Sequence, residues 1–313
     1  MRKFITTVAA TAVLAAGAFA PAFAEYPEKP VTFIVPWPPG DLEDVITRMI
    51  AEDFQAKYGV AAAVVNKPGG GGGPFPGAIE VAQAPADGYT IGSFVLGVPV
   101  LGHQIGIPEL DPAKFDPLGI FITYPFVLAS AGNSPYKTMA ELAAYAKDHD
   151  VALGHFGAPL IPTKVTMAFA KNQGFSWGSE AAFDNLDCNT LASGDADVIN
   201  TTLQLILPCL NEVNILASIT SERIPLTPNA PTLGEVDPTL GMVLWNGLFV
   251  RKETPQDVRD KIIASAKETV MSARVQDVAK QTGGSFYWED ADASAKHIQA
   301  DIDAVTKLNA LLQ

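Results

Sequence analysis

The sequence predicts an α/β protein made of two Rossmann-like α/β domains with a central ligand cleft. Three observations lead to this prediction. An apolar, β-branched strand over residues 31–35 runs directly into a proline-rich loop and a helix start. Strands and helices then alternate up to residue 95, which is typical of parallel βαβ units. A second strand, loop and helix follow in the same order over residues 151–174. Chains of this length usually divide into two domains.

The first strand–loop–helix unit forms a corner suited to binding an anion. Residues 36–40, Pro-Trp-Pro-Pro-Gly, end the strand, because proline cannot donate to a β-ladder and glycine tolerates unusual backbone angles. Asp41 or Asp44 can cap the next helix. The apolar residues of that helix recur at helical spacing: Val45, Ile46, Met49, Ile50 and Phe54. Free N–H groups and the helix dipole at such a start favour negative charge.

The first 24 residues have the pattern of a cleaved secretory signal peptide. Arg2 and Lys3 precede a short apolar core, and residues 22–24 form an A-x-A cleavage site. Cleavage after Ala24 would leave 289 of the 313 residues, and the loss of two basic residues would change the formal charge from −13 to −15. We therefore expect an exported, periplasmic protein with no other membrane span. The charge argues against nucleic acid as a partner.

Further elements follow from apolar runs and turn residues. We expect strands at residues 60–65, 91–95, 151–156, 196–200 and 214–219, with further apolar runs at 121–129 and 242–250. We expect helices to begin near Ala78, Thr138, Thr163 and Thr254, and two more to occupy residues 273–281 and 291–312. The glycine run 69–73 predicts a loop. It lacks the residues of a P-loop, so it is either a ligand contact or a flexible turn.

The two cysteines, Cys188 and Cys209, are disulfide candidates in an oxidising compartment, and the alternative is two buried free thiols. The four histidines lie far apart in sequence without the spacing of metal ligands. We therefore expect neither a metal nor a cofactor.

Six motifs occur in a fixed order along the chain. They are Tyr-Pro-Glu-Lys-Pro at 26–30, Pro-Trp-Pro-Pro-Gly-Asp at 36–41 with Asp44, Val-Asn-Lys-Pro-Gly-Gly-Gly-Gly at 65–72, Ala-Asp-Gly-Tyr-Thr at 86–90, Pro-Thr-Leu-Gly-Glu at 231–235 and Trp-Asn-Gly-Leu-Phe at 245–249. With these motifs the chain resembles the Bug-type periplasmic solute receptors of tripartite tricarboxylate transporters.

The resemblance implies a periplasmic binding protein of the Venus-flytrap type. Domain 1 would comprise residues 25–124 and 243–313, and domain 2 residues 125–242. The implied ligand is a small organic carboxylate, held by backbone groups, helix N-termini and water. The implied partners are the membrane permease subunits of the transporter, and we expect a monomer.

The resemblance and the two corners together give a set of candidate ligand-binding residues. They are Trp37, Pro39, Gly40, Asp41, Asp44, Gly97, His155, Phe156, Gly157, Ala158, Thr163, Asn200 and Thr201. Each also has a structural interpretation. Trp37 and Phe156 are either stacking walls or core aromatics. His155 is either a donor to the ligand or a buried structural residue. Thr163 can bond the ligand or cap its helix, and Asn200 and Thr201 can line the cleft or simply end a strand.

Some residues depart from the family pattern. Asp41 replaces the second glycine of the first loop, and there it would repel a ligand carboxylate, cap the helix or meet a cationic group. An apolar segment, residues 94–100, replaces a small polar loop, and Thr163 stands where many members have histidine. An apolar or aromatic solute with one carboxylate is therefore as well supported as a small polyanion.

Two other functions remain open from the sequence. One is a secreted α/β hydrolase or lyase that uses His155, although the chain has no Gly-x-Ser-x-Gly elbow and we assign no catalytic residue. The other is a solute sensor subunit that reports to a signalling partner.

Overall fold

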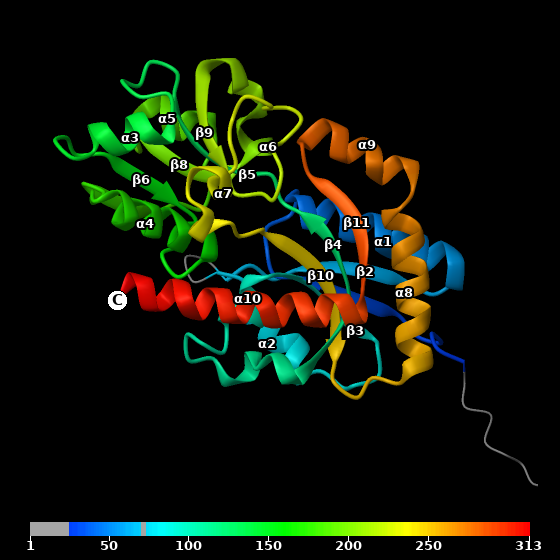
Figure 1. Cartoon of the computed structure of the whole chain (residues 1–313). Coiled ribbons are helices and arrows are strands. Elements are labelled where there is room, and N and C mark those ends of the chain that lie inside the picture. Colours follow the sequence, from blue (N-terminus) through cyan, green and yellow to red (C-terminus); the bar gives the residue numbers. More distant parts are fainter. Residues whose placement is uncertain (1–24, 70–72) are drawn as a thin grey trace, which may run out of the picture.

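The computed structural model describes residues 25–69 and 73–313, so the predicted signal peptide lies outside the described residues. Two β-sheets, each covered by helices, form the architecture (Figure 1). This confirms the mixed α/β fold with two sheets that the sequence predicts.

The first sheet has six strands in the order β11-β4-β10-β3-β1-β2. Their bounds are β1 Val31–Val35, β2 Ala62–Asn66, β3 Thr90–Val95, β4 Phe115–Thr123, β10 Trp245–Arg251 and β11 Ser285–Asp290. Strand β1 pairs in parallel with β2 and β3, whereas β10 runs antiparallel between β3 and β4. The continuous apolar character of β1 follows from its place inside the sheet, where helices cover both faces.

The second sheet has five strands in the order β7-β6-β8-β5-β9. Their bounds are β5 Phe126–Ala131, β6 Ala152–His155, β7 Ser179–Ala182, β8 Val198–Thr202 and β9 Val213–Ser218. Strand β6 is parallel to both β7 and β8, and β5 is antiparallel to β8 and β9.

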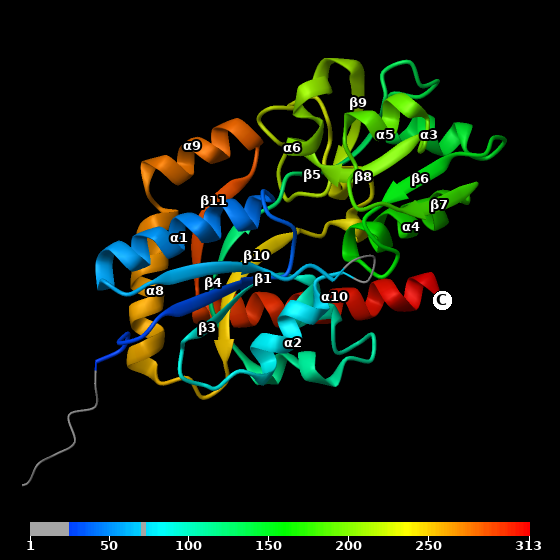
Figure 2. The ribbon, with the colours of Figure 1, turned by 180° about the vertical axis from the view of Figure 1, so that it is seen from behind.

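The helices flank these sheets, as the front and back views show (Figures 1 and 2). They are α1 Leu42–Tyr58, α2 Phe75–Gln83, α3 Met139–Tyr145, α4 Ile161–Gln173, α5 Cys188–Ser193, α6 Leu203–Ile206, α7 Leu233–Val236, α8 Gln256–Val270, α9 Ala273–Thr282 and α10 Ala291–Leu312. A short π-helix, η2, spans Gly97–Leu101. Within the described ranges, no helix has both the length and the apolar character needed to cross a membrane.

The chain crosses between the sheets twice, and the two crossings lie side by side. The outgoing crossing follows β4 at Tyr124, and the returning one precedes β10 at Leu244. The Tyr124 amide donates to the Leu244 carbonyl at 2.8 Å. A third connection is made by packing: α10 lies against α4, and Lys164 Nζ donates to Asn309 Oδ1 at 2.7 Å. Figure 1 shows α10 running from the first sheet toward α4.

The structure also shows elements that the sequence patterns do not predict. The apolar run at 121–129 is the end of β4 and the start of β5, separated at Tyr124 and Pro125. Strand β11 lies between two helices that were predicted, and its sequence Ser-Phe-Tyr-Trp-Glu-Asp has no clear alternation. Strand β7, Ser-Glu-Ala-Ala, is an exposed edge strand without apolar bulk. Both strands depend on their neighbours in the sheet.

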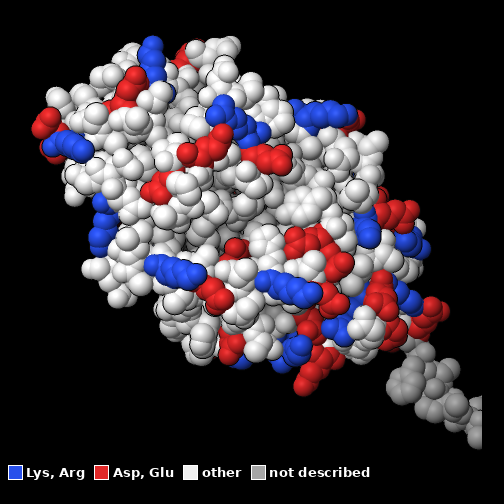
Figure 3. All heavy atoms as spheres, viewed as in Figure 1, with Lys and Arg blue, Asp and Glu red and all other residues white. Residues whose placement is uncertain are grey.

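Charged side chains of both signs are interspersed on the surface. On the face shown in Figure 3, the blue Lys and Arg side chains are separated from one another by white or red residues. That face carries no continuous basic stripe of the kind that binds nucleic acid.

Candidate ligand-binding site

A cavity of about 680 Å³ lies between the two sheets. Its walls come from the β1–α1 loop, the turn after β3, the crossing residues Tyr124 and Leu244, the β6–α4 loop and the end of β8. Eight of the predicted ligand-binding residues line it: Trp37, Pro39, Gly40, Asp41, Gly97, Phe156, Thr163 and Asn200. The β1–α1 and β6–α4 corners, predicted separately from the sequence, thus meet at one cavity.

The other predicted residues do not line this cavity: Asp44, His155, Gly157, Ala158 and Thr201. Thr201 is fully buried, and its hydroxyl donates to the Leu186 carbonyl at 2.7 Å. His155 is 2% exposed and its Nε2 lies 3.5 Å from Glu180 Oε2 on β7. Burial lowers the pKa of His155, against the opposing effect of Glu180. The histidine on which the hydrolase alternative depends therefore lies behind the cavity wall.

The Asp44 carboxylate stabilises the β1–α1 loop through hydrogen bonds. It accepts a hydrogen bond from the Gly40 amide at 2.9 Å and another from Asn66 Nδ2 at 2.8 Å. Asn66 also donates to the Trp37 carbonyl at 3.0 Å, and Arg48 forms an ion pair with Asp44 at 2.9 Å. Burial opposes ionisation of Asp44, but these donors, Arg48 first, hold its pKa below the usual value.

Gly40 has a reason to be glycine, because its φ of 94° lies in the left-handed region. This conformation turns the chain at the start of α1 and presents the next residue, Asp41, to the cavity. The sequence left open whether Asp41 caps the helix. Asp41 occupies the N-cap position, yet its side chain accepts no capping hydrogen bond.

Two carboxyl groups at the start of α1 occupy an unfavourable environment. Burial raises the pKa of Asp41 to about 6, and the charge of Asp44 adds to the rise. Burial, followed by the charge of Asp41, raises the pKa of Glu43 to about 8. The Glu43 backbone amide and the Tyr124 hydroxyl act in the opposite direction. Groups with such shifts at a cavity wall are typical of functional sites.

The second corner is the N-terminus of α4. Leu160 is its N-cap residue and offers no side-chain cap, while Pro162 occupies the first turn. Helix geometry leaves the first-turn N–H groups of Ile161 and Thr163 without intrahelical acceptors. The Thr163 hydroxyl donates to the Gly157 carbonyl at 2.8 Å, so this side chain stabilises the loop that leads into the helix.

Asn200 connects β8 to this corner. Its Nδ2 donates to the Pro162 carbonyl at 2.9 Å and to Thr166 Oγ1 at 2.6 Å. Since a carbonyl can only accept, this pairing fixes the orientation of the amide. Asn200 Oδ1 then has no hydrogen-bond partner in the described part of the chain, although the residue is 1% exposed.

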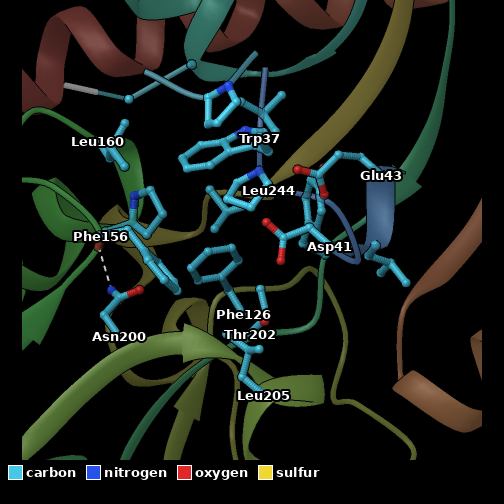
Figure 4. A pocket seen from close by; sticks show the side chains of 18 of the residues that line it. Trp37, Asp41, Glu43, Phe126, Phe156, Leu160, Asn200, Thr202, Leu205 and Leu244 are labelled. Atoms are coloured by element: carbon cyan, nitrogen blue, oxygen red, sulfur yellow. Dashed lines mark hydrogen bonds between the residues drawn. The ribbon is translucent and has the colours of Figure 1, made fainter. Parts of the chain in front are cut away.

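Aromatic rings form much of the remaining wall. Trp37, Phe126 and Phe156 project around the same space in Figure 4. The rings of Phe126 and Phe156 are 6.2 Å apart and nearly perpendicular. Such walls provide apolar contact for a ligand body.

Sequence reasoning missed several lining residues, notably Glu43, Tyr124, Phe126, Phe183 and Leu244. The two crossings could have pointed to Tyr124 and Leu244, because segments that cross between two sheets border the space between those sheets. Glu43 had no such signal, since a glutamate in a first helical turn is ordinarily solvated.

The disulfide prediction is confirmed, because Cys188 and Cys209 are bonded with their Cα atoms 5.9 Å apart. The bond ties the start of α5 to the segment after α6, in the second sheet's half of the molecule. Within residues 25–69 and 73–313, no group of three or more His, Cys, Asp and Glu residues is arranged to hold a metal ion.

Comparisons with known proteins agree with this architecture. The model of the family described as "Tripartite tricarboxylate transporter family receptor" matches residues 46–313. A UPF0065 protein in the tcbD-tcbE intergenic region of Pseudomonas sp. (strain P51) is 26% identical over 273 residues, which cover 82% of this chain and 79% of the relative.

Two solved structures are similar in fold. One is an R. palustris protein with adipate, with a TM-score of 0.79 and 22% identity over 92% of this chain and 98% of that chain. The other is MatC from Rhodopseudomonas palustris with bound malate, with a TM-score of 0.77 and 22% identity over 92% of this chain and 100% of that chain. The family match covers most of the sequence, and the chain belongs to the receptors of the tripartite tricarboxylate transporter family.

Proposed function

We propose that this protein is a periplasmic receptor that binds a small organic carboxylate in the cavity between its sheets and delivers it to a tripartite tricarboxylate permease. The observation that carries the proposal is the meeting of two helix N-termini, those of α1 and α4, at one cavity with aromatic walls. The carboxylates named for the two structural neighbours, adipate and malate, are consistent with it.

The ligand carboxylate is proposed to bind at α4 rather than at α1. The first-turn amides of Ile161 and Thr163 are directed by the helix axis toward the cavity end, and the helix dipole favours an anion there. At α1 the same backbone advantage is opposed by Asp41 and Glu43, which would repel a second anion. The apolar body would then lie among the aromatic walls.

Binding is proposed to close two domains, residues 25–124 with 243–313 and residues 125–242. The hydrogen-bonded crossings at Tyr124 and Leu244 would serve as the hinge, and the contact of Lys164 with Asn309 would adjust as α4 moves against α10. Closure would exclude water from the solute and create the surface that the permease recognises.

The proposal is tested on purified residues 25–313 with a panel of carboxylates, using melting temperature and mass spectrometry of solutes carried through purification. A bound carboxylate should raise the melting temperature in proportion to the logarithm of its concentration above Kd. The panel should include mono- and dicarboxylates with linear and aromatic bodies.

A blocking variant gives a control. A Cβ added at Gly97 meets only Val95, at 4.0 Å, so Gly97→Leu should fold normally and fill part of the cavity. It should keep the ligand-free melting temperature and lose the shift. The proposal fails if no carboxylate shifts the wild-type protein, or if Gly97→Leu responds equally. Delivery is tested by uptake of the same solute in cells that contain the permease, with and without this receptor.

A further inference from the structure

The cavity wall carries carboxyl groups but, among the described residues, no Lys, Arg or His side chain. Asp41, Glu43 and Asp184 all line it. Figure 4 shows the Asp41 carboxylate pointing into the space between Trp37 and Phe126. A cavity that took only anions would not be expected to concentrate negative charge at its centre.

The carboxyl groups of Asp41 and Glu43 differ from that of their neighbour Asp44. Asp44 is neutralised by Arg48 at 2.9 Å and accepts two further hydrogen bonds. Asp41 accepts no capping bond from the helix it begins, and the charges that act on Asp41 and Glu43 are those of other carboxyl groups. The protein therefore supplies no counter-charge to this pair.

A separate observation, on the opposite wall beside the α4 corner, is a second acceptor that lacks a donor within the described ranges. Asn200 Oδ1 is buried without a hydrogen-bond partner, because both of the assigned contacts of this amide use Nδ2. In Figure 4 its oxygen lies on the cavity side of the amide. An unsatisfied buried acceptor is costly, so this atom calls for a donor from a ligand.

We infer that Asp41 and Glu43 form a subsite for a positively charged nitrogen, so that the preferred solute carries an ammonium group, an apolar body and one carboxylate. This inference rests on the proposed function, because the carboxylate is assigned to the N-terminus of α4. An ammonium group has three donors and no acceptor, which suits two carboxyl groups on which no cationic side chain of the described chain acts. A dicarboxylate would instead place its second negative charge against Asp41.

The Asp41 and Glu43 carboxyls can carry the negative charge that a cation subsite needs near neutral pH. The Asp41 carboxyl, with a pKa of about 6, is mainly ionised at pH 7.5. The pKa of Glu43, about 8 without ligand, would be lowered by a nearby cation, so that binding would favour its charged form as well.

The test compares solutes that differ only in one end group. On a linear body these are 6-aminohexanoate, heptanoate and adipate, and on an aromatic body 4-(aminomethyl)benzoate, 4-ethylbenzoate and terephthalate. Binding is measured by melting temperature and calorimetry at pH 7.5 for the wild type, Asp41→Asn and Glu43→Gln. Asp148→Asn, an exposed aspartate outside the cavity, is the matched control.

In the linear or the aromatic series, the amine-bearing solute should bind about tenfold or more tightly than the matching methyl and dicarboxylate solutes. Such a difference is expected for a charge-assisted contact. Asp41→Asn should remove most of this preference, Glu43→Gln should reduce it, and Asp148→Asn should leave it unchanged. Equal or tighter binding of the methyl or dicarboxylate solutes overturns the inference and leaves the proposed function intact. A preference that survives Asp41→Asn also overturns it. If none of the six solutes binds while another carboxylate of the panel does, the inference fails and the proposed function stands. If no carboxylate binds at all, both fail.

Discussion

Glu43 gives the sharpest physical prediction, because it is 3% exposed and has a pKa of about 8. An unfolded chain returns this carboxyl to its ordinary pKa of 4.5. Between these two values the folded protein holds a proton that the unfolded chain has lost. The free energy of unfolding therefore falls as pH rises through this window.

The magnitude follows from the linkage relation. Each pH unit inside the window costs the folded state about 1.4 kcal/mol, and the cost levels off near the upper pKa. From pH 6 to pH 8, the wild type should thus lose about 2 kcal/mol that Glu43→Gln does not lose. Asp41 has a pKa of about 6 and contributes mainly below this range, and it remains in both proteins.

The assay is urea unfolding at pH 6, 7 and 8 with the disulfide intact, analysed for the wild type, Glu43→Gln and the exposed control Glu222→Gln. The difference between Glu43→Gln and wild type should grow with pH, and that for Glu222→Gln should stay constant. Parallel pH curves for Glu43→Gln and wild type would refute the assignment of a protonated Glu43. Asp41→Asn provides an independent check, because removing its charge lowers the pKa of Glu43 and shortens the window.

Three other changes test separate parts of the structure. Replacing Cys188 and Cys209 by serine should lower the free energy of unfolding by roughly 3 kcal/mol, because the disulfide closes a loop of about 20 residues. The wild type with reductant should match the variant, and an unchanged urea midpoint would contradict the prediction. Asp44→Ala should cost about 2 kcal/mol or more, because the Gly40 amide loses its acceptor; a neutral effect in the same titration would show that water replaces the carboxylate. Trp37→Ala should weaken solute binding about tenfold or more through lost apolar contact, and unchanged calorimetric affinity would place the ring outside the binding contact.

Local sequence patterns predicted the parts of this protein that local interactions form. The run at 31–35 is a strand because its residues are apolar and β-branched, and prolines and Gly40 end it. The helix ends at Gly59 and Gly174, both in left-handed conformations, follow the same local logic. These signals were sufficient to place both corners that border the cavity.

The missed features depend on contacts between distant segments. His155 is buried beside Glu180, which lies on an exposed edge strand that has no apolar pattern of its own. Glu43 stands in a first helical turn, where a glutamate is ordinarily solvated, but here it is buried against the crossing residue Tyr124. Sequence spacing predicts which residues start a helix, whereas burial at that start depends on a segment about 80 positions away in the chain.

Glu43→Gln is expected to raise the free energy of unfolding but to lower the preference for an amine-bearing solute. These opposite effects distinguish a carboxyl that binds ligand from one that has only a structural cost. Burial of Glu43 costs stability in the free protein, so Glu43→Gln should raise the free energy of unfolding at pH 8. If the same carboxyl forms a cation subsite, the same substitution should reduce the preference for an amine-bearing solute. A substitution that disrupts folding would lower both the free energy of unfolding and the solute preference. A substitution at a residue with only a structural cost would change the free energy of unfolding alone. A gain in stability together with a loss of selectivity is therefore the result expected of a carboxyl that the cavity retains for its ligand without a cationic partner in the described part of the protein.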